Sequence, residues 1–181
     1  MPYEPPPELA ELSLAQVAEL VAARKLPPLD QWAPDTVGDS EMRIAAGGRW
    51  FHQGGEIRRP AMVRAFASLL LKDDTGQHWL VTPTQKLSIA VDDAAFIAVD
   101  VKQEGGALAF RLNTDDLVIA GTDHPLRLAG DADNPAVYLA VRHGTEARLN
   151  RSTWAQLAEI AIAGGGDAVT SQGVTFRLAC A

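Results

Sequence analysis

Arginine is the residue type whose placement most favours a binding function in this chain. Arg58, Arg59 and Arg64 flank a predicted helix near residues 60–70. A second set, Arg142, Arg148 and Arg151, flanks a predicted helix near residues 153–162. Because a guanidinium group donates parallel hydrogen bonds, arginine suits recognition of a carboxylate or phosphate. If the two segments pack face to face, Arg59 and Arg151 could meet at a seam; the alternative is ion pairing with the excess acidic residues.

Two carboxylate pairs, Asp92-Asp93 and Asp115-Asp116, could support acid–base chemistry if one pKa in a pair were raised. Each pair lies between predicted strands, where aspartate side chains commonly cap turns. The histidines, at positions 52, 78, 124 and 143, have no spacing typical of a metal site. A hydrolase that uses Asp92, Asp93 or His124 is therefore the least favoured function. We predict no catalytic residue, no metal ligand and no cofactor.

The stretch Arg49 to Leu71 predicts a strand, a turn and a helix. Residues 49–53 are rich in aromatic side chains and lie between two glycine pairs, which accept the positive φ of tight turns. Pro60 suits the first turn of a helix, and Val63 and Phe66 begin an apolar face at helical spacing. Residues 79–81 then resume extended structure.

A similar order of elements recurs over residues 137–162. Residues 137–141 predict a strand, His143-Gly144 a tight turn, and residues 147–149 another strand. Thr153 with Gln156 fits a capping box at the start of a helix, which a run of three glycines ends. We therefore predict an internal duplication that equates residues 49–71 with residues 137–162; a chance match of the common ββαβ order is the alternative.

The remaining segments complete an α+β prediction. Residues 1–34 predict a proline-rich arm with one helix, which Ser13 and Gln16 begin as a capping box. The strands elsewhere alternate apolar and polar residues and follow one another as hairpins, which favours antiparallel sheets over a doubly wound parallel sheet. The prediction is two similar ββαβ-type halves with antiparallel sheets, at residues 35–94 and 95–181.

Composition excludes several classes of protein. The chain has 181 residues and a net charge of -7, so it lacks the basic surface that general nucleic-acid binding needs. Cys180 is the one cysteine, which rules out an internal disulfide. The N-terminal residues do not resemble a signal peptide, and no apolar run is long enough for a membrane span. We expect a cytoplasmic protein without membrane insertion, which could form a homo-oligomer.

Several motifs together resemble a bacterial family of unknown function. They are Arg49-Trp50-Phe51-His52-Gln53-Gly54, Leu80-Val81-Thr82-Pro83-Thr84-Gln85-Lys86, Asp92-Asp93-Ala94-Ala95-Phe96, Leu112-Asn113-Thr114-Asp115 and Glu146-Ala147-Arg148-Leu149-Asn150-Arg151. The resemblance covers residues 26–162. It implies a duplicated core, a C-terminal half similar to a pleckstrin-homology roll, and a pocket between the halves for a nucleotide-like ligand, with a role in signalling. The family usually has Glu where this chain has Gln85, and Pro where it has Ala95. Because this chain lacks the carboxylate beside Lys86, a catalytic role at position 85 is disfavoured.

We therefore expect a small-ligand-binding or signalling module that holds an anion, such as a nucleotide, in the cleft between the halves. Trp50 would form an aromatic wall of that site. Positive charge would come from Arg59, Lys86 and Arg142, and hydrogen bonds from Thr82 and Asn113. The alternative is a protein-interaction scaffold without a small ligand, in which strand edges and the arm recruit a partner.

Overall fold

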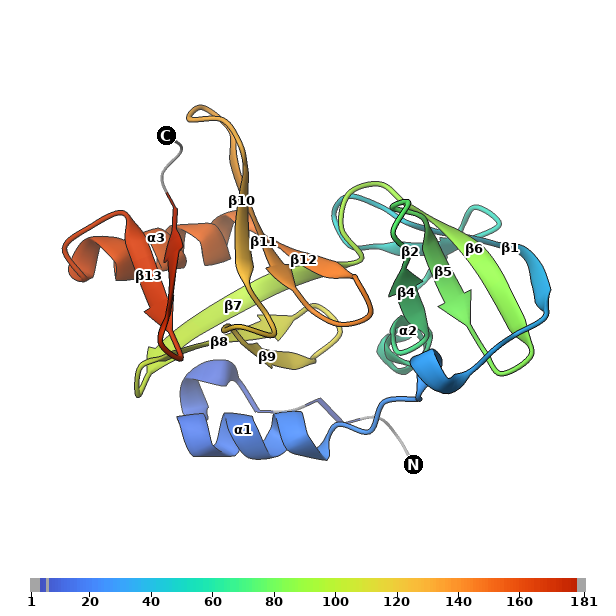
Figure 1. Cartoon of the computed structure of the whole chain (residues 1–181), viewed down its shortest axis with the longest axis horizontal. Helices are drawn as coiled ribbons and strands as arrows, with labels where there is room; N and C mark the ends of the chain where they lie inside the picture. Colours follow the sequence, from blue (N-terminus) through green and yellow to red (C-terminus); the bar gives the residue numbers. More distant parts are fainter. Residues whose placement is uncertain (1–3, 6, 179–181) are drawn as a thin grey trace.

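The computed structural model describes residues 4, 5 and 7–178 and contains two six-stranded sheets, one in each half of the chain (Figure 1). Figure 1 shows the halves side by side, with the first helix beneath the C-terminal half. Cys180 and part of the proline-rich lead-in lie outside the described residues. The predicted α+β class is confirmed by these sheets and the few helices that accompany them.

The N-terminal half forms one sheet with strand order β3-β2-β1-β6-β5-β4. Its elements are β1 (Thr36–Ile44), β2 (Trp50–His52), β3 (Gly55–Ile57), α2 (Pro60–Ala67), β4 (Leu70–Lys72), β5 (His78–Val81) and β6 (Gln85–Val91). Pro60 occupies the first turn of α2, as predicted, because a proline lacks only an N–H that has no partner there.

The C-terminal half forms the second sheet, with strand order β10-β11-β12-β7-β8-β9. Its elements are β7 (Phe96–Glu104), β8 (Ala107–Leu112), β9 (Leu117–Ile119), β10 (Leu126–Gly130), β11 (Pro135–Ala140), β12 (Glu146–Leu149) and α3 (Arg151–Ala163), followed by the hairpin β13 (Ala168–Ser171) and β14 (Val174–Arg177). Gly164 ends α3 as the glycine run predicted.

The two sheets have the same topology. In each half, two three-stranded antiparallel meanders join where the first strand of the half lies parallel to the last, as β1 with β6 and β7 with β12. The prediction of two similar halves is confirmed. The sheets are mostly rather than wholly antiparallel, because β1 with β6 and β7 with β12 are parallel pairs.

The prediction of which strands correspond in the two halves was wrong. Strands β2 and β3 correspond in topology to β8 and β9, whereas the sequence motifs equated them with β11 and β12. Helix α2 connects the two meanders of its half, but α3 follows the last strand of its sheet. The ββαβ order therefore arises at different points of the two halves, and local element order alone could not reveal this.

One apolar core runs through both halves. It includes Ile44 and Trp50 of the N-terminal half together with Phe96 and Phe110 of the C-terminal half. At the seam, the backbone N–H of Lys72 donates to the carbonyl oxygen of His143 at 2.9 Å. Burial of this shared apolar surface is the main force that holds the halves together.

The N-terminal arm contains the 3-10 turn η1 (Leu9–Glu11), helix α1 (Leu14–Ala23) and the 3-10 turn η2 (Leu29–Gln31). Its first part, η1 and α1, packs as a separate layer on the C-terminal half, whereas η2 lies beside the N-terminal half (Figure 1). The capping box of Ser13 and Gln16 is confirmed at the start of α1. Leu9, Leu12 and Val17 form their own small apolar cluster with Ala109 of β8. The arm is thus held by fewer buried contacts than the two sheets.

The cap of α3 differs from the predicted capping box. The helix begins at Arg151, and the side chain of Asn150 accepts a hydrogen bond from the backbone N–H of Thr153 at 2.8 Å. Thr153 itself is fully buried inside the first turn. The prediction of a cap at Thr153 was wrong because β12 ends at Leu149 and the next residue turns the chain into the helix.

Replacing Asn150 with alanine should lower the free energy of unfolding by roughly 0.5–2 kcal/mol, since the first turn of α3 loses its cap. Urea unfolding followed by circular dichroism measures the change. The matched control is Ser152→Ala, on an exposed residue of the same turn, which should change stability by less than about 0.5 kcal/mol. The opposite ranking of the two variants would contradict this assignment of the cap.

Candidate functional site

A buried carboxylate at the end of the β8–β9 turn organises the most unusual polar cluster in the described part of the chain. Asp115 adopts φ 65°, and the backbone N–H of Leu112 donates to the carbonyl oxygen of Asp116 at 2.8 Å. This closes a tight turn and directs the side chain of Asp116 inward, where it is 3% exposed. A carboxylate that is this buried needs charged partners.

Three arginines from different segments supply those partners. Nε of Arg24, just after α1, lies 2.7 Å from Asp116 Oδ1, and Nη1 of Arg64 in α2 lies 3.2 Å from the same oxygen. Nη2 of Arg142, between β11 and β12, lies 3.4 Å from Oδ2. The cluster therefore joins the arm, the N-terminal half and the C-terminal half at one point.

Further hydrogen bonds fix the geometry of the cluster. The hydroxyl of Thr114 donates to Asp116 Oδ2 at 2.8 Å, and Arg64 donates to the carbonyl oxygen of Thr114 at 2.5 Å. Arg142 also donates to the carbonyl oxygen of Ala67, the last residue of α2, at 3.3 Å. Nη2 of Arg24 and Nε of Arg142 are buried without a hydrogen-bond partner among the described residues.

The charges around Asp116 alter its pKa and that of Arg142. Burial by itself raises the pKa of Asp116. The charge of Arg142, the hydrogen bond and charge of Arg24, and the charge of Arg64 together outweigh burial, so the pKa lies below the usual value. Burial lowers the pKa of Arg142, and the positive charges of Arg24 and Arg64 lower it further. The charge and the hydrogen bond of Asp116 raise this pKa but offset the lowering only in part. Several positive charges thus lie close together around one negative charge.

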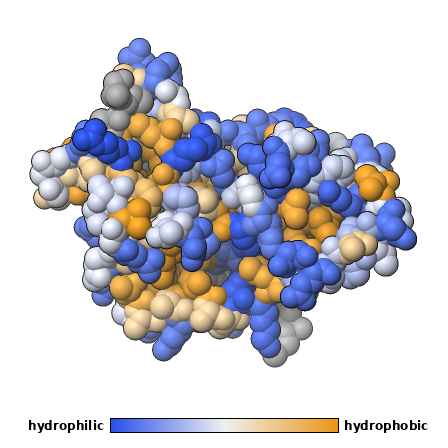
Figure 2. Space-filling model, in the orientation of Figure 1, coloured by the Kyte–Doolittle hydropathy of each residue, from blue (hydrophilic) through white to orange (hydrophobic). Residues whose placement is uncertain are grey.

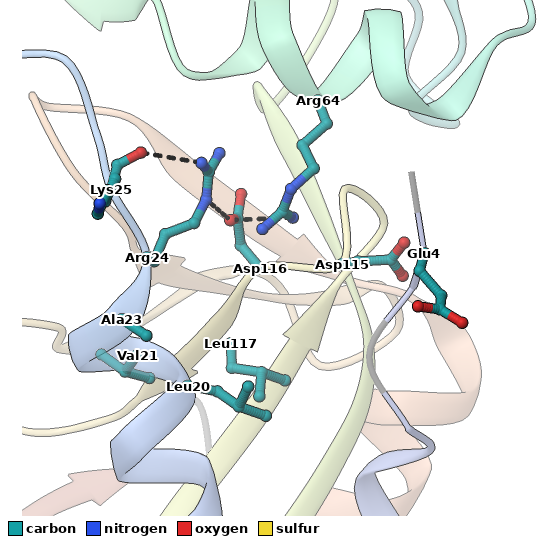
Figure 3. A pocket seen from close by; sticks show the side chains of 10 residues that line it. All are labelled: Glu4, Leu20, Val21, Ala23, Arg24, Lys25, Arg64, Asp115, Asp116 and Leu117. Atoms are coloured by element: carbon teal, nitrogen blue, oxygen red, sulfur yellow. Dashed lines mark hydrogen bonds and ion pairs between the residues drawn. The ribbon is translucent and has the colours of Figure 1, made fainter. Parts of the chain in front are cut away.

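A cavity of about 450 Å³ opens beside this cluster (Figure 3). Arg24, Arg64 and Asp116 lie along one side of it, and Asp115 and Glu4 lie on another. Its apolar wall consists of Leu20, Val21, Ala23 and Leu117. We call this cavity the junction pocket. A pocket that is mostly apolar with a few polar groups at one end is typical of sites for small molecules.

Of the six predicted binding residues, Arg142 belongs to the Asp116 cluster, and Trp50 and Asn113 line a separate cavity of about 160 Å³ at the seam. Trp50 is buried, stacks on Phe66 with ring centroids 6.4 Å apart, and leaves its indole N–H without a partner in the described residues. Asn113 bridges the halves, since its amide donates to the carbonyl oxygen of Gly48 at 3.5 Å.

The other three predicted residues lie elsewhere in the N-terminal half. Arg59 is exposed at the start of α2, and Thr82 accepts a hydrogen bond from the backbone N–H of Gln85 within a turn. The ammonium group of Lys86 lies 4.5 Å from the ring centroid of Trp79. The structure therefore does not bring the six residues together in one cavity, because the β5–β6 turn and the seam are separate parts of the half.

The predicted approach of Arg59 and Arg151 at the seam is also not observed. Arg151 lines a cavity of about 430 Å³ with Gly47 of the N-terminal half, whereas Arg59 is absent from its lining. The arginines of the two halves that meet instead are Arg64 and Arg142, through Asp116.

The residues considered for hydrolase chemistry do not converge either. Asp92 pairs with Arg43, and Asp93 accepts hydrogen bonds from Tyr138 at 2.7 Å and Arg148 at 2.9 Å. Nδ1 of His124 lies 3.0 Å from the carbonyl oxygen of Ala140. Within residues 4, 5 and 7–178, no group of three or more His, Cys, Asp or Glu side chains has the geometry of a metal site.

Sequence reasoning missed Arg24 and the buried state of Asp116, although one signal for Asp116 was present. Leu112, Thr114, Asp116 and Val118 follow one another at a spacing of two residues, and all four are buried. A charged residue at an inward position of an alternating pattern indicates a buried charge that must find partners. Arg24 carries no comparable signal.

The surface and the helices add two observations. Figure 2 shows apolar residues over the C-terminal half and along the lower left, with hydrophilic residues predominating where the halves meet. No helix in the described part of the chain combines the length and the apolar character needed to cross a membrane.

Comparison with known proteins identifies relatives over nearly the whole chain. Residues 27–94 match the model of the "Domain of unknown function (DUF1285), N-terminal domain", and residues 95–178 match the "Protein of unknown function (DUF1285), C-terminal domain". No curated protein sequence matches.

Two crystal structures are similar to this chain. A DUF1285 family protein from Silicibacter pomeroyi DSS-3 has 38% sequence identity and a TM-score of 0.78, over 92% of this chain and 94% of that protein. A DUF1285 family protein from Shewanella baltica OS155 has 24% identity and a TM-score of 0.55, over 65% of this chain and 90% of that protein, and shows likeness of fold alone.

Proposed function

This chain belongs to the DUF1285 family, whose description assigns no function, and from the geometry we propose that it is a small-ligand-binding module that holds an anion in the junction pocket. The observation that carries the proposal is the convergence of Arg24, Arg64 and Arg142 on the single carboxylate of Asp116. In a chain of net charge -7, such a local excess of positive charge is the feature that a small anion would recognise.

The position of the pocket suits a role in signalling. Arg24 belongs to the arm, which packs on the C-terminal half through a small apolar cluster, and Arg64 belongs to the N-terminal half. A ligand that contacts both arginines favours the arrangement in which the arm and the two halves are together. The protein would act in the cytoplasm and report the ligand through the position of its arm.

A second part of the proposal concerns the fold of the C-terminal half. Its six-stranded sheet with α3 following the last strand supports a likeness to a pleckstrin-homology roll, which we also propose.

Thermal unfolding in the presence of small anions tests the proposed function. The panel contains inorganic phosphate, sulfate esters, phosphate esters and carboxylates. An anion at about tenfold its Kd stabilises the folded state by roughly 1.4 kcal/mol, which raises the Tm by about 3–6 °C. Arg64→Gln should abolish the shift, because it removes a guanidinium group from the pocket while keeping a polar side chain of similar length.

Two further variants give this experiment its controls. Arg58→Gln removes an arginine that is 83% exposed and paired with Glu56, so it should keep the full shift. Arg59→Ala compares the junction pocket with the site predicted from sequence: the shift persists if the junction pocket binds the anion, and disappears if Arg59 does. If no anion of the panel raises the Tm, the proposed function is contradicted.

A further inference from the structure

We infer that the N-terminal half contains a second binding site, a cavity that takes the alkyl chain of a small aliphatic molecule with one polar end. The cavity has a volume of about 340 Å³ and lies between α2 and the sheet of that half. Its described lining shares no residue with that of the junction pocket. We call it the apolar cavity. The inference goes beyond the proposed function, and either can fail without the other.

The apolar cavity exists because α2 is too short to cover its sheet. The eight residues of α2 extend about 12 Å. The six strands of the sheet, at a spacing of about 4.8 Å, span about 24 Å between the two outer strands. Several apolar residues that line the cavity are therefore only partly buried against the core: Ile57, Phe66, Leu69 and Leu87.

A bulge in β1 lies beside the apolar cavity. Three residues of β1, from Ser40 to Met42, lie opposite the single residue Ile89 of β6. Glu41, in the middle of these three, has φ 58°, a conformation that residues other than glycine adopt infrequently. Bulges bend a strand, redirect its side chains and are common next to active sites. Here the bulge contributes both Ser40 and Met42 to the lining.

The chemistry of the lining selects an alkyl group. Seven of the ten described lining residues are apolar. The hydroxyl of Ser40 donates to the carbonyl oxygen of Ser88 at 2.7 Å and accepts from the N–H of Met42 at 3.1 Å. The hydroxyl of Thr82 likewise donates to the carbonyl oxygen of Gln85 at 3.3 Å and accepts from its N–H at 3.0 Å. A polar ligand group inside would lose its hydrogen bonds to water without full replacement.

The polar end of the ligand lies at the opening of the cavity. His52 and Met62 are the exposed members of the described lining, so they mark this opening. The imidazole of His52 can donate or accept a hydrogen bond, and water is also available there. Strand order places β2, which carries His52, three strands from β5, which carries Leu80, a distance of about 14 Å. An extended chain can thus run from the opening toward Leu80.

The shape of the site favours a small molecule over a protein partner. A volume of about 340 Å³ lies within the range typical of small-molecule sites. A stable protein interface would instead need a surface of roughly 800 Å² on each partner. Among the large apolar residues that are exposed in the described part of the chain, Met62 is the one that lines the cavity. The apolar surface therefore lies inside the hollow more than around it.

Nuclear magnetic resonance of methionine methyl groups tests the inference. The chain has three methionines, and two of them, Met42 and Met62, line the cavity. The probes are n-octanol, n-butanol and the octanediol with a hydroxyl at each end. Octanol should shift both methyl signals and bind at least about thirtyfold more tightly than butanol, because four more methylene groups leave water. It should bind at least about tenfold more tightly than octanediol, whose second hydroxyl would enter the apolar interior.

Two variants of α2 connect this binding with the cavity. Met62→Asp places a carboxylate at the opening and should weaken octanol binding at least about tenfold, as followed by the methyl signal of Met42. Met62 is 41% exposed, so the substitution leaves the core intact. Ala65→Asp is the matched control, since Ala65 is an exposed residue of the same helix outside the described lining, and octanol should bind it as it binds the wild type. Circular dichroism confirms that both variants are folded.

The contrary outcomes are equally specific. Methyl signals that stay unchanged up to the solubility limit of octanol would overturn the inference, and so would equal affinities for octanol and octanediol. If the protein forms dimers that Met62→Asp dissociates and that octanol leaves intact, the cavity is an interface between copies and the inference is wrong. The anion panel decides the proposed function separately, so failure of the octanol titration leaves the junction pocket unaffected.

Discussion

Replacing Asp116 with asparagine should lower the free energy of unfolding by about 3–5 kcal/mol, the cost typical of removing one partner from a buried ion pair. Asparagine preserves the shape of the side chain but removes the charge that Arg24, Arg64 and Arg142 share. The arginines would then repel one another in a largely buried site. Urea unfolding at pH 7 measures the change.

An exposed aspartate provides the control for this prediction. Asp92 forms a salt bridge with Arg43 at the surface, and exposed pairs contribute only about 0–1 kcal/mol. Asp92→Asn should therefore change stability by less than about 1 kcal/mol. If Asp116→Asn proves as mild as this control, the cluster does not hold the arm and halves together in the way we describe.

The dependence on pH gives a second test of the same residue. The pKa of Asp116 in the folded protein is below its usual value, so its contribution to stability is complete above the unfolded pKa of about 3.9 and is lost as the pH falls through the lower folded pKa. The difference in stability between the wild type and Asp116→Asn should be constant from pH 5 to pH 8. It should become smaller only below about pH 4.

The comparison must be made between the two proteins rather than on the wild type alone. Burial, chiefly, lowers the pKa of His78 and of His143. For a group with a lowered folded pKa, the unfolded chain binds protons first, so stability falls as the pH drops below about 6.5. Both histidines are present in both proteins, and taking the difference removes most of their contribution.

Gly144→Ala should destabilise the protein by roughly 2–5 kcal/mol, the sum of a strained backbone and a steric overlap. Gly144 has φ +78°, and an added Cβ atom would overlap the backbone carbonyl oxygen of Lys72. This contact lies at the seam, next to the hydrogen bond from the N–H of Lys72 to His143. The substitution therefore pushes the two halves apart at a point where neither backbone can yield easily.

Gly165→Ala is the control that separates the cost of backbone strain from the cost of steric overlap. Gly165 has φ +88°, but an added Cβ atom would meet nothing within 4 Å, so only the conformational cost of about 1–2 kcal/mol applies. Hydrogen exchange provides a readout specific to the seam: the amide of Lys72 should exchange faster in Gly144→Ala and at the normal rate in Gly165→Ala. Equal destabilisation by the two variants, with unchanged exchange at Lys72, would refute the close approach.

The features predicted correctly are those that depend on residues close in sequence. The capping box of Ser13 and Gln16, the helix start at Pro60 and the helix end at Gly164 each depend on backbone geometry within one turn. The cap of α3 failed because Asn150 and Thr153 are both suitable cap residues, and the end of β12 determines which of them precedes the helix.

Only the strand pairing in the two sheets shows which strands of the two halves correspond. Both halves contain a ββαβ segment, but strand pairing assigns it to the first meander of one sheet and to the second meander of the other. Pairing between distant strands depends on hydrogen bonds and burial that a local pattern does not encode. The sequence therefore indicates that there are two halves without indicating how their strands correspond.

By itself, the sequence determined the class of the fold, the local starts and ends of helices, and the presence of arginines suited to binding anions. Only the tertiary structure decided which of these arginines meet. Arg24, Arg64, Asp116 and Arg142 come from four segments separated by tens of residues. Sheet pairing and the docking of the arm bring them within hydrogen-bond distance, because the energy of a buried charge depends on its neighbours in space and not on its neighbours in sequence.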